Sequence, residues 1–355
     1  MTKKMKMPLV GALFAIVSVA LVLLGNPGNM GLCVACFLRD TAGALGLHGA
    51  AMVQYARPEV IGIILGALII SLITKEFASK GGSSPITRFV LGICVMIGAL
   101  IFLGCPTRMV LRIAGGDLNA IVGLFGFAAG IFGGIFFLKK GFSLKRTYNV
   151  SNTDGVALPL MSILLLVALI FFPVLLNFSE EGPGSAHAPM LIALAAGLIM
   201  GGVGFISRLC FVAGIRDSVL FKNFSMLSAF VALLVVGIVG NIIFGSFNLG
   251  FEGHPVAHTD GIWNFLGLAL VGLGSVLLGG CPFRQVVLAG SGNSDSVAAL
   301  FGMIFGAALA HNLSLASSAD GVSQNGPVGF IIAAVIMLSI AVYNTYFNKK
   351  ARETI

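Results

Sequence analysis

The sequence predicts an all-α integral membrane protein with about ten transmembrane helices, two inverted repeats and short re-entrant half-helices that carry cysteines. Three observations lead to this fold class. Of the 355 residues, 57% are hydrophobic and only 10% are charged, whereas a soluble domain is about one-quarter charged. Apolar runs long enough to cross about 30 Å of hydrocarbon recur along the chain. A cysteine-containing motif also occurs once in each half of the chain.

Ten apolar runs have the length of a membrane-spanning helix. They cover residues 8–24, 59–74, 86–103, 118–138, 156–177, 188–206, 224–245, 261–279, 295–313 and 328–346. Four further segments are too short, or too interrupted by glycine and proline, to span the membrane. These are residues 26–57, 104–117, 207–223 and 280–294. We expect the four segments to enter the membrane without crossing it.

The charged residues predict which side of the membrane each loop faces. The formal net charge is +8, but the basic residues lie between apolar runs, which favours a membrane over a nucleic acid as the partner. With the N-terminus inside, the cytoplasmic segments hold Lys3, Lys4, Lys6, Lys75, Lys80, Lys139, Lys140, Lys145, Arg146, Lys349, Lys350 and Arg352. The outside loops 178–188, 246–260 and 314–327 hold acidic residues and no lysine or arginine. We therefore expect a multi-pass protein of a prokaryotic inner membrane with both termini in the cytoplasm.

Two motifs occur in both halves of the chain. The stretch Gly104–Arg108 reads Gly-Cys-Pro-Thr-Arg, and the stretch Gly280–Arg284 reads Gly-Cys-Pro-Phe-Arg. Cys33 and Cys210 are each followed, after five residues, by an Arg-Asp pair. We therefore predict two related units, residues 1–177 and residues 178–355, with five spans each. Because five is odd, the second unit must enter the membrane upside down, as in many transporters.

Each Gly-Cys-Pro-x-Arg motif is suited to begin a short helix beside an anion. A proline is favourable at the first helical position because it has no N–H to lose, so Cys105 would be the N-cap. The unpaired N–H groups and the dipole at that end attract anions. Arg108 projects near the same face, and Arg112 follows one turn later. Cys281 and Arg284 should build the same device in the second half.

An arginine inside a membrane needs a partner. Asp40 follows Arg39 and Asp217 follows Arg216, but adjacent residues on a helix point apart, so each arginine pairs either with its neighbour or across the repeat. The arginines of the two Gly-Cys-Pro-x-Arg motifs have no acidic residue nearby in the sequence, and an anionic substrate is one candidate partner. The alternative is that the arginines of the short segments lie at the surface with their charged ends in water.

The cysteines indicate the kind of anion. A thiol is a weak donor and a soft, polarizable acceptor, so it suits sulfur or selenium species better than a hard oxyanion such as phosphate. Four cysteines have a counterpart in the other half: Cys33, Cys105, Cys210 and Cys281. A single buried cysteine is usually a small apolar filler. Cys94 fits that role, and Cys36 either fits it or supplies an alternative thiol to Cys33.

Other uses of these residues are less favoured. Cys33 and Cys36 have the spacing of a dithiol redox motif, but no βαβ context surrounds them. A soft metal could bind several thiols, although the accompanying charges are positive. His254 and His258 could hold a metal in an outer loop, but a solvated loop is the favoured interpretation. No nucleotide-binding motif is present, and we expect neither a cofactor nor a resident metal.

With Gly-Cys-Pro-x-Arg at the end of a span and Cys-x5-Arg-Asp earlier in each half, the chain resembles the YeeE/YedE family of sulfur-transport membrane proteins over roughly residues 28–302. That family includes thiosulfate uptake transporters and a selenium-associated branch, to which Cys33–Asp40 looks closest. The resemblance implies an hourglass-shaped protein whose short helices point at its centre, where cysteines relay the substrate through S–H···S contacts. The relay positions would be Cys33, Cys105 and Cys281, with Cys210 as the fourth by repeat symmetry. It also implies a small cytosolic sulfur- or selenium-carrier protein as a partner.

Together these features predict a permease, not an enzyme, for a small sulfur- or selenium-containing anion such as thiosulfate. The predicted substrate-binding residues are Cys33, Cys36, Cys105, Arg108, Cys210, Cys281 and Arg284, and the supporting charges are Arg39, Asp40, Arg112, Arg216 and Asp217. Two alternatives stay open. One is a membrane thiol–disulfide oxidoreductase that uses Cys33 and Cys36, and the other is a structural membrane subunit whose polar pairs fix helix packing.

Overall fold

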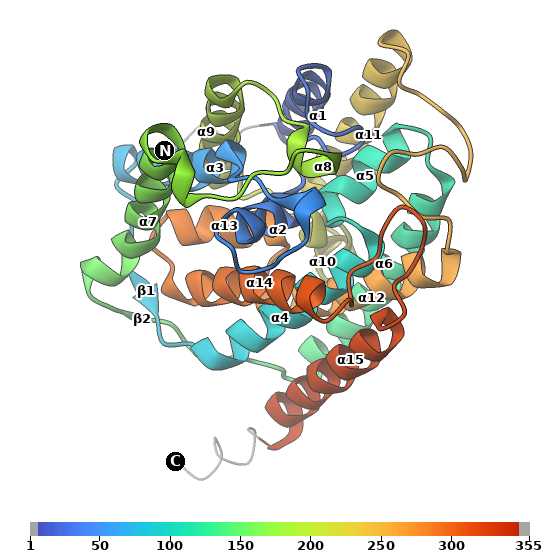
Figure 1. The fold of residues 1–355 in the computed structure, drawn as a ribbon. Helices are drawn as coiled ribbons and strands as arrows, with labels where there is room; N and C mark the ends of the chain where they lie inside the picture. Colours follow the sequence, from blue (N-terminus) through green and yellow to red (C-terminus); the bar gives the residue numbers. More distant parts are fainter. Residues whose placement is uncertain (1–5, 348–355) are drawn as a thin grey trace.

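The computed structural model describes residues 6–347 and confirms the predicted fold class (Figure 1). Nearly all regular structure in that range is helical, and its strands form one short antiparallel pair, β1 (Lys80–Gly81) with β2 (Tyr148–Asn149). Nine stretches of the described chain are helical, long and apolar enough to cross a membrane, and Met7–Leu23 is a shorter apolar helix. The chain is therefore a multi-pass α-helical membrane protein.

The long helices coincide with the ten predicted spans. They are α1 (Met7–Leu23), α3 (Pro58–Ile73), α4 (Pro85–Phe102), α6 (Leu118–Lys139), α7 (Asn152–Phe171), α9 (Met190–Ser207), α11 (Ser225–Ile243), α12 (Gly261–Leu278), α14 (Ser294–Asn312) and α15 (Gly326–Val342). The largest difference from the prediction is at α7, which begins and ends earlier than the predicted 156–177. Ser151 caps its start by accepting from the backbone N–H of Thr153. At the other end Pro173 disfavours a helical conformation in the residue before it, and a 3-10 turn follows at Pro173–Leu175.

Four short helices lie in the four segments that the sequence predicts not to span. They are α2 (Val34–Ala44), α5 (Pro106–Ala114), α10 (Phe211–Phe221) and α13 (Pro282–Gly290). The helices before α5, α10 and α13 each end at a left-handed residue, respectively Leu103, Arg208 and Gly279. This conformation ends an α-helix and redirects the chain. In Figure 1, α2, α10 and α13 lie toward the middle of the bundle.

The main helix pairs join the two halves of the chain. α1 packs on α11 and α3 on α9, α4 packs on α14 and α6 on α12, and α4 also meets α12. Glycines bring these backbones close: a Cβ on Gly66 would overlap the carbonyl of Leu198 between α3 and α9, and a Cβ on Gly130 would overlap the carbonyl of Ala269 between α6 and α12. The two predicted units thus interlock. Their relation as inverted repeats stays a prediction.

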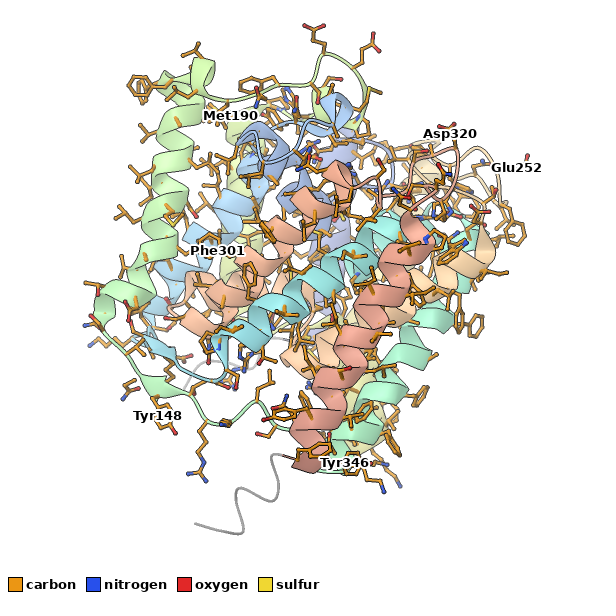
Figure 2. All side chains as sticks on the ribbon, turned by 60° about the horizontal axis from the view of Figure 1, so that its bottom comes forward. Tyr148, Met190, Glu252, Phe301, Asp320 and Tyr346 are labelled. Atoms are coloured by element: carbon orange, nitrogen blue, oxygen red, sulfur yellow. The ribbon has the colours of Figure 1, made fainter. Side chains whose placement is uncertain are left out.

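The bundle has two chemically different ends. Figure 2 shows Tyr148 and Tyr346 at one end and Glu252 and Asp320 at the opposite end. We call the first end the basic face, because the loops that follow α3 and α6 bring lysines to it, and the second end the acidic face. The acidic face carries the loops 172–189, 244–260 and 313–325. Five of the basic residues predicted to be cytoplasmic lie outside the described residues: Lys3, Lys4, Lys349, Lys350 and Arg352.

Candidate functional site

The four repeated cysteines begin the four short helices. Cys33, Cys105, Cys210 and Cys281 are the N-cap residues of α2, α5, α10 and α13. All four are buried, and the most accessible, Cys210, is 6% exposed. A helix N-terminus presents unpaired N–H groups and the positive end of the helix dipole. Each thiol therefore lies where a small anion would be attracted.

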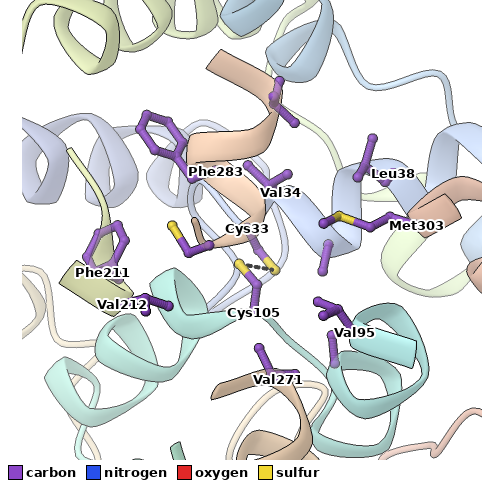
Figure 3. Close-up of a cluster of buried hydrophobic side chains, with 14 of the residues drawn as sticks. Cys33, Val34, Leu38, Val95, Cys105, Phe211, Val212, Val271, Phe283 and Met303 are labelled. Atoms are coloured by element: carbon purple, nitrogen blue, oxygen red, sulfur yellow. Dashed lines mark hydrogen bonds between the residues drawn. The ribbon is translucent and has the colours of Figure 1, made fainter. Parts of the chain in front are cut away.

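The thiols of Cys33 and Cys105 face each other (Figure 3). Their sulfur atoms lie 3.7 Å apart, joined by an S–H···S hydrogen bond. Cys33 Sγ also accepts from the backbone N–H of Cys36 at 3.4 Å. Cys105 Sγ lies 2.6 Å from Thr107 Oγ1 in a second hydrogen bond. Two thiols from distant parts of the sequence thus form one contact in the core, which we call the first thiol pair.

The second thiol pair consists of Cys210 and Cys281. The backbone N–H of Cys281 donates to Cys210 Sγ at 3.5 Å. Phe211 and Phe283, close to these two cysteines in sequence, set their rings edge-on against Phe14 at centroid distances of 5.6 and 5.5 Å. Figure 3 shows Phe211 and Phe283 beside the first thiol pair. All four thiols belong to the large buried apolar core, in which α10 contacts α5 and α13 contacts α2.

Arg108 lies in the first turn of α5 and is 1% exposed. Its Nη1 donates to the carbonyl of Leu103 at 2.6 Å and to Cys36 Sγ at 3.5 Å. Its Nη2 donates to the carbonyls of Pro255 and Val256 at 3.4 and 3.2 Å. Within residues 6–347 no carboxylate pairs with Arg108, and its Nε has no hydrogen-bond partner. Its charge is therefore balanced by neutral acceptors alone.

Arg284 is the counterpart of Arg108 in α13. Its Nη1 donates to the carbonyl of Gly204 at 3.4 Å, and no described carboxylate pairs with it either. Unlike Arg108, it is only partly buried. The two predicted anion-attracting arginines thus share a shortage of acidic partners and differ in their access to solvent.

Arg39 and Arg57 share one carboxylate. Arg39 Nη2 lies 2.7 Å from Asp40 Oδ1, and Arg57 Nε lies 2.8 Å from Asp40 Oδ2. The sequence left open whether Arg39 pairs with its neighbour, and the structure shows that it does, because the long side chain folds back. Arg57 is absent from the predicted site. Its remaining donors bind the carbonyls of Pro183 at 2.7 Å and Ala186 at 3.1 Å.

The other predicted supporting charges are paired locally. Arg216 Nε lies 2.8 Å from Asp217 Oδ1, again between neighbours, in a pair that is 22% and 21% exposed. Arg112 Nε lies 2.6 Å from Asp117 Oδ2, and its guanidinium stacks over the ring of Phe102 at 4.3 Å. Arg112 therefore anchors the end of α5, and its charge is not free to attract an anion.

The alternative of surface arginines is wrong for the first half of the chain. The short segments of the first half contain Arg39, Arg57, Arg108 and Arg112, and each is buried to 2% exposure or less. Loops of the acidic face supply carbonyl acceptors to two of them. An arginine buried in this way costs free energy unless its donors are satisfied, which explains why these loops fold inward.

The expectation of a solvated loop holds for most of residues 244–260, which are exposed, but not for His254 and His258, which are buried. His258 is 1% exposed, and its Nε2 lies 2.8 Å from the carbonyl of Ile101 in α4. Burial lowers the pKa of His258, which keeps the ring neutral near pH 7. No group of three or more His, Cys, Asp or Glu side chains in the described part of the chain could hold a metal ion. Part of loop 244–260 thus contacts α4 and α5 through His258, Pro255 and Val256, while most of its residues stay exposed.

Sequence reasoning missed several polar residues around the thiols. Asp117 is the N-cap of α6 and the partner of Arg112, and its signal is the pair of glycines that precedes it before an apolar run. Thr107 stands inside the repeated motif but has no counterpart in the second half. Glu59 and Asn26 are buried and hydrogen-bonded to each other at 2.8 Å. The one signal for Glu59 in the sequence is its position, since an acidic residue at the start of a membrane span is unusual.

Comparison with known proteins decides the family. The model of the family described as sulphur transport matches residues 206–347, which include Cys210, Cys281 and Arg284. The chain belongs to the sulphur transport family. An uncharacterized protein of Methanocaldococcus jannaschii is 36% identical over 89 residues, which cover 85% of that protein and 23% of this chain. Family membership confirms the resemblance that the cysteine motifs predicted, and with the multi-pass fold it makes this chain a membrane transporter of sulfur compounds.

Proposed function

We propose that the chain is a prokaryotic inner-membrane permease for a small sulfur- or selenium-containing anion that passes between the four central cysteines. The observation that carries the proposal is the contact of 3.7 Å between Cys33 Sγ and Cys105 Sγ at the starts of two short helices. A thiol in that place can donate S–H to a soft anion and accept from its neighbour. The substrates that fit this chemistry are thiosulfate and small selenium anions.

The charge of the anion would be met by Arg108. Its present partners are carbonyl oxygens and the sulfur of Cys36. An anion forms shorter and stronger charge-assisted bonds with a guanidinium than a neutral carbonyl does. An arriving anion would therefore displace the carbonyls of Pro255 and Val256, which belong to a loop, while Leu103 stays bound.

The second thiol pair would continue the route. Cys210 and Cys281 lie in the same apolar cluster as the first pair, and Arg284 supplies a charge that is partly open to solvent. We expect the anion to enter from the acidic face as the external side and to leave at the basic face. A cytosolic sulfur- or selenium-carrier protein would receive it there, as the family resemblance implies.

Uptake of labelled thiosulfate and labelled selenite, in cells that lack their own routes, tests the proposal. Wild type is compared with the double variant Cys105→Ser/Cys281→Ser at matched membrane expression. Cys94→Ser is the control, because Cys94 is buried in α4 and has no counterpart in the repeat. We expect one label to accumulate in wild type and in the control and to be lost in the double variant.

Two outcomes would count against the proposal. If well-expressed wild type accumulates neither label, the chain does not carry these anions alone. If the double variant transports as well as Cys94→Ser, the thiols do not bind the substrate and a packing role is left for them.

A further inference from the structure

Glu59 is a buried carboxyl group that the proposed route does not use. It lies in the first turn of α3 and is 0% exposed. Its Oε1 accepts from Asn26 Nδ2 at 2.8 Å. Its Oε2 is buried and has no hydrogen-bond partner among residues 6–347. Ionisable groups inside a membrane protein are costly to bury and are usually functional.

The amide of Asn26 connects Glu59 to two other segments. Asn26 Oδ1 accepts from the backbone N–H of Ala188 at 2.9 Å, and Asn26 Nδ2 lies 3.4 Å from the carbonyl of Gly31, two residues before Cys33. We call residues 182–188 the strap, because this segment of the acidic face binds both Asn26 and Arg57 at the start of α3. One side chain thus ties Glu59 to the strap and to the loop that leads into the first thiol pair.

The strap has a second fastening. Arg57 donates to the strap carbonyls of Pro183 and Ala186, and its Nε is bound to Asp40. Glu59 shares no ion pair with Arg57 in the described structure, where the carboxylate partner of Arg57 is Asp40. Both fastenings start from the same end of α3. Whatever loosens them would expose Arg57, which the strap covers.

The surroundings of Glu59 favour its neutral form while the strap is closed. An ionised carboxylate with one hydrogen bond costs far more to bury than a carboxylic acid. The charged or titratable groups that face it are Arg57, Asp40 and Tyr55, with Arg39 behind Asp40 on α2 and His187 of the strap stacked on Tyr55. The neighbouring helices α1 and α9 contain none. Two other helices that pack on α3 carry a charged residue, and each of these residues has its own surroundings. On α7, Asp154 is next to Gly155, which packs on Ser79 beyond the far end of α3. On α13, Arg284 binds the carbonyl of Gly204.

We propose that Glu59 is a proton-binding site that holds the strap closed while it is protonated and releases the strap when the proton leaves. On opening, the O–H bond of the carboxylic acid breaks, water at the acidic face takes the proton, and the carboxylate becomes hydrated. Closing reverses these changes. This inference deepens the proposed function, on which its meaning for transport rests, because the strap binds Arg57, the partner of the predicted supporting charge Asp40. It makes access to the site from the acidic face dependent on pH.

The test measures opening of the strap without any substrate. Ala188→Cys places a thiol at a position that is 0% exposed, and its reaction with a water-soluble maleimide is followed by mass spectrometry of that peptide between pH 5 and 8. The rate is divided by the rate of the same thiol in the Ala188→Cys/Glu59→Gln protein at the same pH, which cancels the titration of the thiol. Release of one proton on opening raises this ratio with pH by at most about tenfold per pH unit.

Ser185→Cys is the control, because Ser185 is exposed in the closed strap and its ratio should not change with pH. Asn26→Ala is a second variant, in which the link is cut and the carboxyl is kept. We expect it to raise labelling of Ala188→Cys at every pH and to flatten the pH dependence. A ratio that stays constant from pH 5 to pH 8 would overturn the proposal, as would an unchanged pH dependence in Asn26→Ala. If labelling follows the proposal but thiosulfate and selenite uptake fails, the control of the strap by Glu59 is supported and only the proposed transport function is rejected.

Discussion

Cys33 and Cys105 begin different short helices, and their sulfur atoms nevertheless lie 3.7 Å apart in the core of the bundle. The contact depends on two chain reversals. One is the loop between α1 and α2, and the other is the left-handed residue Leu103 that ends α4. The neighbouring thiol of Cys36 points to a different partner, Arg108. The two cysteines of α2 therefore have separable roles.

Replacing these two cysteines one at a time should give different kinetic effects. Cys33→Ser removes the S–H···S contact with Cys105, so we expect the maximal rate of thiosulfate or selenite uptake to fall. Cys36→Ser alters only a contact with Arg108, so we expect a change in apparent KM of about fivefold or less, the equivalent of one hydrogen bond. Concentration-dependent uptake in proteoliposomes separates the two. Identical kinetics for both variants would contradict the assignment.

The buried ion pair of α5 should matter for stability more than its exposed counterpart. Asp117→Asn leaves Arg112 buried without its carboxylate, and breaking such a pair costs about 3 kcal/mol or more. Asp217→Asn breaks a pair that is 22% and 21% exposed, where about 1 kcal/mol or less is expected. Thermal unfolding in detergent, followed by circular dichroism, compares the two variants. Equal losses would show that Arg112 finds another partner.

Close packing between α6 and α12 gives a matched pair of glycine substitutions. A methyl group at Gly130 would overlap the carbonyl of Ala269, whereas at Gly133 the nearest atom is Leu273 Cδ1 at 3.9 Å. Gly130→Ala should therefore destabilise the protein by about 1–3 kcal/mol through overpacking. Gly133→Ala should be neutral or slightly stabilising, because alanine is the better helix former. The apparent Tm of each purified variant measures the difference, and a similar Tm for both would refute the close approach of the two backbones at Gly130.

The rate of proteolytic cleavage next to the strap measures how far Arg57 restrains the strap. Glu180 and Glu181 precede the strap and are exposed, so a glutamate-specific protease can report on its mobility. Arg57→Gln removes donors to the carbonyls of Pro183 and Ala186, and we expect faster cleavage.

Arg146→Gln is the control for this experiment, because Arg146 is exposed and lies in the loop after α6. Its cleavage rate should equal that of wild type. If Arg57→Gln is cleaved as slowly as wild type and Arg146→Gln, other contacts hold the strap in place.

The sequence was sufficient for the membrane spans and for the places where they are interrupted. Hydropathy alone locates the ten long helices, since length and apolarity are what a bilayer selects. The Cys-Pro pairs also predicted where α5 and α13 begin, because proline is favourable only at the start of a helix. These features depend on local composition, which a single sequence displays directly.

The partners of the buried charges could not be predicted in the same way. Asp117 pairs with Arg112 across a helix end, and Arg57 is held by carbonyls of residues 183 and 186, far along the chain. A backbone carbonyl is present in every residue, so no side-chain type marks it as an acceptor. His258 shows the same difficulty, because its loop looks solvated until Ile101 and Arg108 are seen to draw it inward.

The unequal burial of the arginines has an electrical consequence. In the first half of the chain the arginines of the short segments are buried, and loop carbonyls bind two of them, whereas in the second half Arg216 and Arg284 still touch solvent. Solvent therefore reaches arginines of the second half directly, whereas those of the first half are out of its reach. In this conformation an anion in solution would meet the charge of Arg284 before it could meet that of Arg108.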